Sequence, residues 1–387
     1  MTSPLPTAAA VTRRCLVLVF ALVLTASTIA LLSPARAAAA TSTVDGITYS
    51  VTPNAGATVT NYDGSAGTAV TIPETVAING AEYTVTAIGE QAFYTNALTS
   101  VTLPDTLTAI GDSAFQSNQL ASVDLPDTVT TIGNVAFGAN LLTAVTLPDN
   151  LTTIGFQAFA YNQLRSVTLP DTLTTLGDLA FQSNDLATVA LPDSLTSIGF
   201  GAFQDNQLTS VTMPHALTTL DGDAFAQNGA LSRVRFTGPA PAMFTGADQD
   251  YPSLGDAQGL TVEFSSQYSA QDGRAGFTTP EWRGYTTIPA YTVSFLAGAD
   301  STIDPVIMWP GETPELPTPL LQGYTFVGWY SDINSNIRFD PEAPLTGDVT
   351  VVAGWKPNSI PATPLTPASG SLSGGSIGDH SLVGYGS

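Results

Sequence analysis

Five aspartates recur every 22 residues in the middle of the chain, and carboxylates in such a row could bind a cation. Each follows a proline: Asp105, Asp127, Asp149, Asp171 and Asp193. Because Ca²⁺ prefers several carboxylate oxygens, a calcium-binding column is one hypothesis. The alternative, which we favour, is that each aspartate stabilises only the turn after its own proline. The segment Asp332–Asn336 begins like a calcium loop, but Ile337 occupies the place where that loop needs glycine. We therefore predict no metal site.

Two further columns with the same spacing carry hydroxyl groups that could bind a ligand. The second outward column is entirely threonine: Thr108, Thr130, Thr152, Thr174, Thr196 and Thr218. The first outward column is small and polar: Thr102, Asp124, Thr146, Thr168, Ala190 and Thr212. A flat threonine ladder resembles an ice-binding surface, although β-branched threonine also suits any exposed strand position. Binding through one of these columns is the main prediction, and ice binding is a remote alternative.

The residues needed for catalysis are scarce. The chain has one cysteine, Cys15, and two histidines, His215 and His380, which lie 165 positions apart. It contains no GxSxG, HExxH or phosphate-binding loop. The repeating carboxylates occupy equivalent environments, so nothing separates the pKa values of an acid and a base. We predict a protein without catalytic residues or a cofactor.

The strongest pattern in the chain is an internal repeat. Phenylalanine recurs with the same 22-residue period at Phe93, Phe115, Phe137, Phe159, Phe181, Phe203 and Phe225. Asparagine keeps the period at Asn96, Asn118, Asn140, Asn162, Asn184, Asn206 and Asn228. A fixed period of this length indicates a solenoid. Phe115, Phe137, Phe159, Phe181 and Phe203, with Asn118, Asn140, Asn162, Asn184 and Asn206, are predicted to form its structural ladders, the asparagines through hydrogen bonds between their buried amides.

One unit, LTSVTLPDTLTAIGDSAFQSNQ, predicts two short strands and one helical turn. Alternation around Val101 and Leu103 favours a strand that the LPD sequence ends. Leu107 and Ile110 point inward from a second extended segment, Gly111 permits a tight bend, and Asp112 is predicted to cap a helical turn. Such a unit cannot cover its own apolar side chains, so neighbouring units must stack. The predicted fold is mostly β with short helical turns, in a right-handed solenoid of 22-residue coils.

The repeated LPDxLxxIGxxAFxxN resembles the BspA-like leucine-rich repeat of bacterial and protist surface proteins, from about Ile72 to Phe236. The resemblance implies a leucine-rich solenoid and a role in adhesion or recognition. Family members often have cysteine where this chain has its asparagine column, so this version is expected to be indifferent to redox state.

A second module, C-terminal to the repeats, has a different sequence pattern. Residues 291–356 contain alternating YTVSF, then GYTFVGWY, then a closing VTVVAGW. They resemble the internalin-type B repeat, also called the Listeria-Bacteroides repeat, which implies a small β-grasp-like module that serves as a spacer or accessory binding unit. Phe295, Phe326, Trp329 and Trp355 are expected to form its core.

The ends of the chain and of the array complete the predicted domain organisation. Residues 1–40 have paired arginines, an apolar stretch from Cys15 to Leu32 and small residues around Ala37, the order of a cleaved secretory signal peptide. A retained anchor is the alternative, because the stretch reaches the lower limit for spanning a bilayer. Residues 41–75 are predicted as an N-terminal cap, 76–236 as the solenoid, 237–290 as a C-terminal cap and linker, and 357–387 as a flexible Pro, Ser and Gly-rich tail.

Charge restricts the partners. With 10 Lys and Arg against 32 Asp and Glu, the chain has a formal net charge of −22. Nucleic acid is excluded as a partner because its binding needs a basic footprint, and anionic polymers are repelled. We predict a monomeric bacterial protein, secreted or at the cell surface and not inserted in the membrane after signal cleavage, that binds an extracellular protein or polysaccharide. A structural envelope or spacer role is the alternative.

Overall fold

The computed structural model describes residues 40–51, 56–244, 250–255, 259–270, 276–298, 302–332 and 337–358. The predicted signal peptide, apart from Ala40, and the predicted tail beyond Asn358 lie outside the described residues. Within the described residues, the chain is built almost entirely from short strands and turns, and its one helix is a 3₁₀ turn at Ser266–Tyr268. No helix in this part of the chain is long and apolar enough to cross a bilayer.

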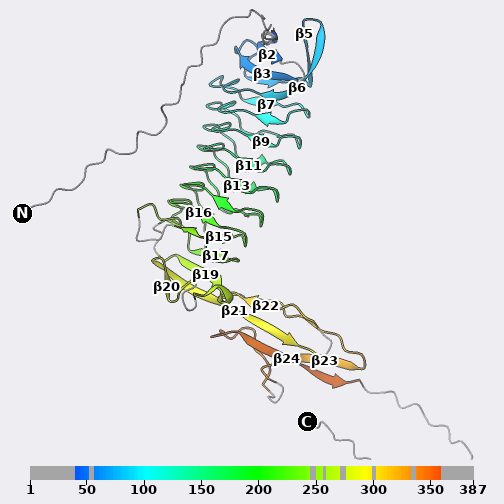
Figure 1. The fold of residues 1–387 in the computed structure, drawn as a ribbon, viewed down its shortest axis with the longest axis vertical. Coiled ribbons are helices and arrows are strands. Elements are labelled where there is room, and N and C mark those ends of the chain that lie inside the picture. The colour runs from blue at the N-terminus through cyan, green and yellow to red at the C-terminus, as the bar shows by residue number, and fades with distance from the viewer. Residues whose placement is uncertain are drawn as a thin grey trace, which may run out of the picture.

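An antiparallel meander closes the N-terminal end of the solenoid (Figure 1). It consists of β1 (Ala40–Val44), β2 (Ile47–Val51) and β3 (Ala57–Tyr62). The last of these pairs in parallel with β6 (Ala81–Ile88), which also forms a hairpin with β5 (Thr75–Ile78). β4 (Ala69–Thr71) already pairs with a strand of the next coil, so coil stacking begins at Ala69. The strands of the cap thus form hydrogen bonds directly with the first coil.

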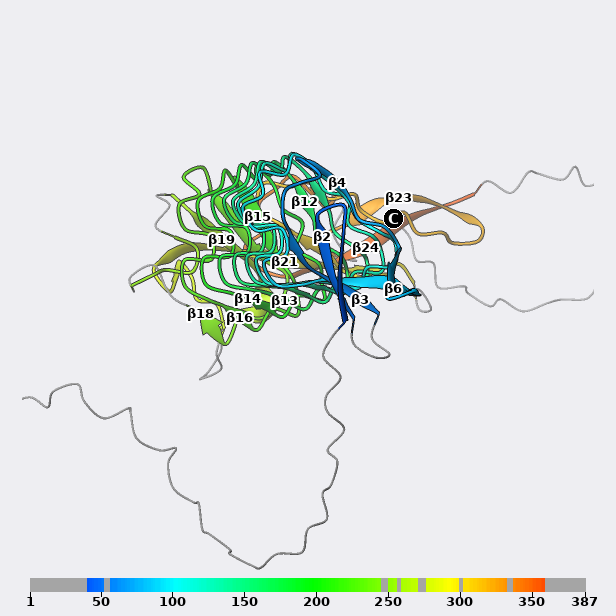
Figure 2. The same ribbon diagram turned by 90° about the horizontal axis from the view of Figure 1, so that it is seen from above.

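Each coil contributes a strand to one long parallel sheet, which follows β6 in register. The members are β8 (Ala109–Ile110), β9 (Thr131–Ile132), β11 (Thr153–Ile154), β13 (Thr175–Leu176), β14 (Ser197–Ile198), β16 (Thr219–Leu220) and β18 (Met243–Phe244). In β8 to β16 a buried Ile or Leu alternates with an outward Ala, Thr or Ser, as the sequence predicts, whereas β18 has Met243 and Phe244 at these positions. Seen from above, β13, β14, β16 and β18 lie on one flank of the stack (Figure 2).

The LPD segments form a second, interrupted parallel ladder on another side of each coil. Its paired strands are β4 with β7 (Ser100–Thr102), β10 (Val145–Thr146) with β12 (Val167–Thr168), and β15 (Ser210–Met213) with β17 (Arg233–Phe236). Isolated bridges at Asp124–Thr146 and Thr168–Ala190 keep the register between these pairs. In the regular coils a proline follows this segment and keeps each strand short, since it cannot donate a further hydrogen bond.

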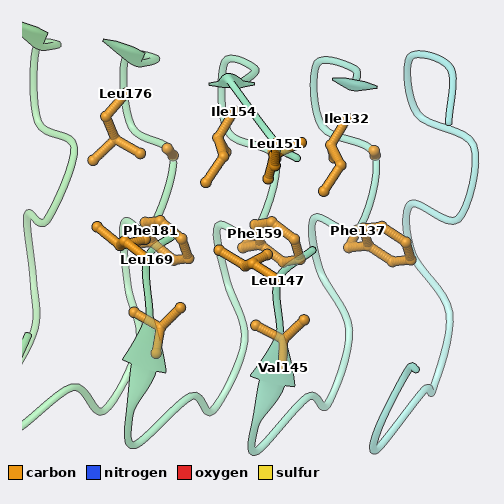
Figure 3. Packing of buried hydrophobic residues seen from close by; sticks show 14 of the residues in the cluster. Ile132, Phe137, Val145, Leu147, Leu151, Ile154, Phe159, Leu169, Leu176 and Phe181 are labelled. Atoms are coloured by element: carbon orange, nitrogen blue, oxygen red, sulfur yellow. The ribbon is translucent and has the colours of Figure 1, made fainter. Parts of the chain in front are cut away.

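The phenylalanine column fills the centre of the stack, as predicted. All seven rings are at most 1% exposed. Consecutive rings from Phe93 to Phe225 lie 5.0–5.7 Å apart and within 15° of parallel. Figure 3 shows Phe137, Phe159 and Phe181 in one row, with Ile132, Ile154 and Leu176 in a second row beside them. Each ring therefore has its apolar neighbours in the coils above and below.

The third side of the coil differs from the predicted helical turn. It is a pair of hydrogen-bonded turns, in which Ala114 N–H donates to Gly111 and Gln116 N–H to Ser113. Two residues of the segment, Ser113 and Ser117, have left-handed backbone, with φ of 54° and 58°. A left-handed residue cannot continue a right-handed helix, so the prediction of a helix at this position was wrong. The carboxylate of Asp112 caps nothing in its own coil and instead accepts the backbone N–H of Asn134 in the next one, at 2.7 Å.

Gly111 is required for close approach rather than for a special bend. Its φ is not in the left-handed region. A Cβ built on it would lie 2.9 Å from Gly89 C and 3.0 Å from Ile88 O of the previous coil. Glycine at this position therefore allows adjacent backbones to stack.

The asparagines form a ladder, but each amide bonds to the backbone rather than to the next amide. Asn162 is 9% exposed. Its Nδ2 donates to Phe137 O (3.0 Å) in the previous coil and to Phe159 O (3.1 Å) in its own, while its Oδ1 accepts from Leu142 N–H (3.1 Å). Asn118, Asn140, Asn184, Asn206 and Asn228 repeat this pattern. The amide satisfies three buried backbone groups and ties two coils together.

At the C-terminal end the solenoid passes into the second module without a break in its hydrogen bonding. The ladder of β15 and β17 continues through β19 (Thr261–Ser265) to β21 (Tyr285–Leu296), which also pairs with β20 (Glu281–Trp282). The second half of β21 pairs with β22 (Val306–Met308) and β24 (Val349–Pro357), and β24 pairs with β23 (Tyr324–Tyr330). One 12-residue strand thus belongs to both units (Figure 1).

The module has strand order β22-β21-β24-β23 with a parallel central pair and antiparallel outer pairs. Phe295 and Trp329 are buried in its core, with ring centroids 4.7 Å apart. Phe326 and Trp355 are partly buried against them. All four aromatics therefore occupy the core to which the sequence assigned them.

Charged side chains reinforce the junction. Glu263 on β19 is only 3% exposed at its side chain and pairs with Arg233 (3.2 Å) and Arg235 (2.9 Å). Arg235 also contacts Glu312, and its guanidinium carbon lies 4.2 Å from the ring centroid of Trp309 in the second module. Since the shared strand and these contacts act together, the two units meet at a fixed joint.

The asparagine column predicts a pH-dependent variant. Asn162→Ala leaves the buried N–H of Leu142 unpaired and removes one of the two amide donors to Phe137 O and to Phe159 O, which keep Asn140 and Asn184 as partners. It should lower the free energy of unfolding by about 2 kcal/mol. Asn162→Asp should be at least as damaging at pH 7, because a carboxylate cannot donate to Phe137 O and Phe159 O. Burial beside those carbonyls would raise the pKa of the new carboxyl above its unfolded value. Its penalty should therefore shrink as the pH falls and the group protonates. Urea unfolding at pH 7 and pH 5, each relative to the unmodified protein, tests this, and an equal loss at both pH values would contradict it.

The junction makes a second prediction. Arg235→Met keeps an apolar stem against Trp309 but removes one of the two arginine partners of the buried Glu263, which keeps Arg233. It should destabilise the chain by about 2 kcal/mol. Arg165→Met is the matched control, because Arg165 is exposed and takes part in none of the described ion pairs. Thermal unfolding of both variants measures the difference. Equal melting temperatures for the two would show that the ion pairs do not stabilise the joint.

Candidate binding surface

The first outward column forms a flat polar strip on the LPD side of the solenoid. Its residues alternate with buried valines such as Val145 and Val167, so the strand period directs them to solvent. Asp124, Thr146, Thr168 and Ala190 lie directly opposite one another across adjacent coils. The exposed members are Thr102, Asp124, Thr146, Thr168, Ala190 and Thr212. The structure thus brings the predicted residues together on one flank.

The second outward column is also exposed, and its hydroxyls are used within the solenoid. The Oγ1 of each threonine donates to the backbone carbonyl of the corresponding residue one coil earlier, at 3.0–3.4 Å, in Thr108, Thr130, Thr174, Thr196 and Thr218. This flank therefore presents methyl groups and acceptor oxygens more than hydroxyl donors. Thr152 occupies the equivalent exposed position.

The aspartate column lies in solvent at the turn after each proline. The backbone carbonyls of Asp105 and Asp149 accept the hydroxyls of Thr128 and Thr172 in the following coil, at 2.8 and 2.6 Å. Asp105 and Asp127 line a shallow hollow with Asp124. Even so, no three His, Cys, Asp or Glu side chains in the described ranges are grouped closely enough to hold a metal ion. Of the second candidate, Asp332–Asn336, only Asp332 lies within the described residues.

The sequence analysis missed a group of exposed aromatic residues on the turn side of the coils. Phe156 is 42% exposed, Tyr161 52% and Tyr251 63%. Phe200 is partly exposed and contacts Tyr251 with ring centroids 5.8 Å apart. Phe156 and Phe200 occupy the position of Asp112, and Tyr161 the position of Ser117. Alignment of the coils could have found them, because these positions are polar or small in the other repeats.

The clearest pKa shifts lie away from all of these columns. Burial, with a smaller contribution from Asp45, raises the pKa of Tyr49 to about 12. Burial also raises the pKa of Tyr62 in the same cap, while the hydroxyl and backbone N–H of Ser65 lower that of Asp63. Tyr49 and Tyr62 pack in the core of the N-terminal meander. Their shifts reflect packing and not an acid–base site.

Comparison with known proteins agrees with this architecture. The model of the BspA type leucine rich repeat region matches six copies, over residues 74–185 and 130–241. The model of the Listeria-Bacteroides repeat domain matches residues 291–354. Residues 74–241 are BspA-type leucine-rich repeats. No curated protein matches the chain.

Solved structures similar to this chain come from bacteria. A leucine-rich repeat protein from Bacteroides ovatus is 23% identical, with 59% of this chain and 72% of that chain covered and a TM-score of 0.45. A leucine-rich cell surface protein from Faecalibacterium prausnitzii is 26% identical, with 59% and 67% covered and a TM-score of 0.41. The BspA-type leucine-rich repeats suggest interaction or adhesion as the role of the chain, and repeat proteins of this kind are typically not enzymes.

The aspartate column predicts a negative response to calcium. It offers one exposed carboxylate per coil, whereas Ca²⁺ takes six to eight oxygen ligands. Millimolar CaCl₂ should therefore leave the melting temperature within about 1 °C of the value in EDTA, since a ligand that binds only the folded state would raise it. MgCl₂ at equal ionic strength controls for screening of the net charge. A rise specific to calcium would restore the calcium hypothesis.

Proposed function

We propose that this protein is exported and acts at the cell surface or outside the cell as a non-enzymatic recognition protein. It binds an extracellular protein or polysaccharide through an exposed flank of the solenoid. The observation that supports this most directly is the division of each coil into two populations of side chains. The repeating apolar residues point into one continuous core, and the intervening residues form exposed columns that stay in register over many coils.

The dimensions of the flank suit macromolecular recognition. Six coils spaced about 4.8 Å apart give a column about 24 Å long. This length is close to the edge of a square patch of about 800 Å², the area that each partner buries in an interface of standard size. The first outward column is flat and small, so the backbone can approach a partner closely. The acidic surface selects against polyanions and for neutral or basic partners.

A structural role as a spacer is the second candidate, and one observation favours it. β21 runs without interruption from the solenoid sheet into the second module, and Arg235 bridges the two units. A joint of this kind would hold the second module at a fixed distance and direction from the array. Recognition and spacing make different predictions for binding.

Screening the intact chain from residue 41 against arrays of extracellular proteins and glycans tests recognition. The halves should not be separated at residue 290, because the cut would divide β21. We expect saturable binding to at least one component, weakened about tenfold or more, or about 1.4 kcal/mol, by a bulky charged residue on the responsible flank. Thr146→Arg places it on the first outward column, and Thr152→Arg is the matched variant on the second.

The pattern of loss identifies the flank. Loss with Thr146→Arg alone places the contact on the first outward column, and loss with Thr152→Arg alone places it on the second. Absence of saturable binding to either array, together with retention of the protein in the cell envelope, would contradict recognition and favour the spacer role.

A further inference from the structure

The turn side of the solenoid carries its own column, which continues past the last regular coil. In each coil the carbonyl of the residue at this position accepts a backbone N–H from the coil before it. Asp223 N–H donates to Tyr251 O just as Leu179 N–H donates to Phe200 O. Tyr251 therefore extends the column although it lies outside the 22-residue period. The column is Asp112, Asn134, Phe156, Asp178, Phe200, Gly222 and Tyr251.

From Phe156 onward, this column has an aromatic ring on every second coil. Phe200 and Tyr251 meet edge to face across Gly222, with an interplanar angle of 68°. A Cβ on Gly222 would lie 3.1 Å from Tyr251 Cβ and 3.4 Å from Phe200 Cδ2. The glycine thus leaves room for the two rings to approach each other. Aromatic residues, Phe and Tyr included, are enriched in the cores of protein interfaces relative to the rest of the surface.

Carboxylates lie between these rings. Asp178 separates Phe156 from Phe200 and is fixed by the backbone N–H of Phe200, which donates to its Oδ1 at 2.9 Å. In the neighbouring column, Asp205 lies two coils beyond Tyr161 and accepts the hydroxyl of Ser183 at 2.8 Å. Between Ala69 and Leu231 the sequence contains a single Arg or Lys, Arg165. We call the exposed group formed by Phe156, Tyr161, Asp178, Phe200, Asp205 and Tyr251 the turn edge.

The chemistry of the turn edge selects a cationic side chain with an apolar stem. Aromatic faces attract guanidinium and ammonium groups, and the stems of Arg and Lys cover apolar surface. A polyanion is repelled by the carboxylates. A second copy of this chain is disfavoured by its net charge of −22. The chain uses the same combination at its own junction, where Arg235 lies over Trp309 and pairs with Glu312.

We propose that the turn edge binds an arginine- and lysine-rich segment of a partner protein. This deepens the recognition function proposed above, on which it rests, by naming the binding surface and the class of partner. The two outward columns then flank the contact and do not make it.

Fluorescence anisotropy with a labelled oligoarginine peptide tests the proposal on the intact chain from residue 41. At physiological ionic strength, Phe156→Ala with Phe200→Ala should weaken binding by about tenfold, as expected for hot-spot aromatics. Asp178→Asn with Asp205→Asn should weaken it by a similar factor. The matched control, Asp105→Asn with Asp127→Asn, removes the same charge from exposed positions on the LPD side and should change affinity less than about twofold.

Thermal unfolding checks that each variant remains folded, and Phe200→Trp, which keeps a ring, should retain binding. Equal weakening by the control pair, or no effect of losing the rings, would show that the peptide responds only to net charge and would overturn the proposal. A partner found on the protein arrays that is lost with Thr146→Arg but unaffected by the turn-edge variants would also overturn it, while leaving the recognition function intact.

Discussion

The structure depends on the inability of one coil to bury its own phenylalanine. Each ring is covered by the rings of the coils before and after it, at about 5 Å, and the same neighbours supply the backbone partners of the buried asparagine. Burial of the phenylalanine rings and hydrogen bonding of the asparagine amides therefore both require an adjacent coil in register. Because both are satisfied only between coils, stability is a sum of nearest-neighbour terms, and each end of the array needs a cover.

The two ends meet that need in different ways. At the N-terminus an antiparallel meander pairs its last strand with the first coil. At the C-terminal end, the parallel ladder of the solenoid continues through β19 to β21. The second half of β21 is a central strand of the second module. The module is therefore also part of the cover. Arg235, placed between Glu263 and Trp309, stabilises the place where one sheet serves two cores.

The period of the sequence was sufficient to predict the solenoid and the inward direction of Phe115, Leu107 and Ile110, because inward positions are defined by the apolar residue they require. The second module was found from its motifs GYTFVGWY and AGW and not from a period. The turns were harder. Left-handed residues are as different as Ser113, Val135 and Leu179, so composition does not reveal them, and an aspartate before an AF pair looks like a helix cap. The continuity of β21 was hidden because its two halves resemble different modules. The aromatic turn edge was missed because Phe156, Phe200 and Tyr161 interrupt columns that are otherwise polar, and Tyr251 joins them only through the fold.

The same constraint indicates where function can vary. At the inward positions a substitution disturbs three coils at once, and at Gly111 or its equivalents even a methyl group would collide with the previous coil. The outward strand positions are freer, but a threonine there already bonds to its neighbour. The turn positions place their carbonyls in the ladder while their side chains leave the stack, so Asp, Asn, Phe and Gly all occupy the same column without altering it. A departure from the repeat at such a position is not required by packing. Three aromatic rings occur there on alternate coils, next to carboxylates, and the only Arg or Lys between Ala69 and Leu231 is Arg165. Binding of a partner explains why these rings are exposed to solvent.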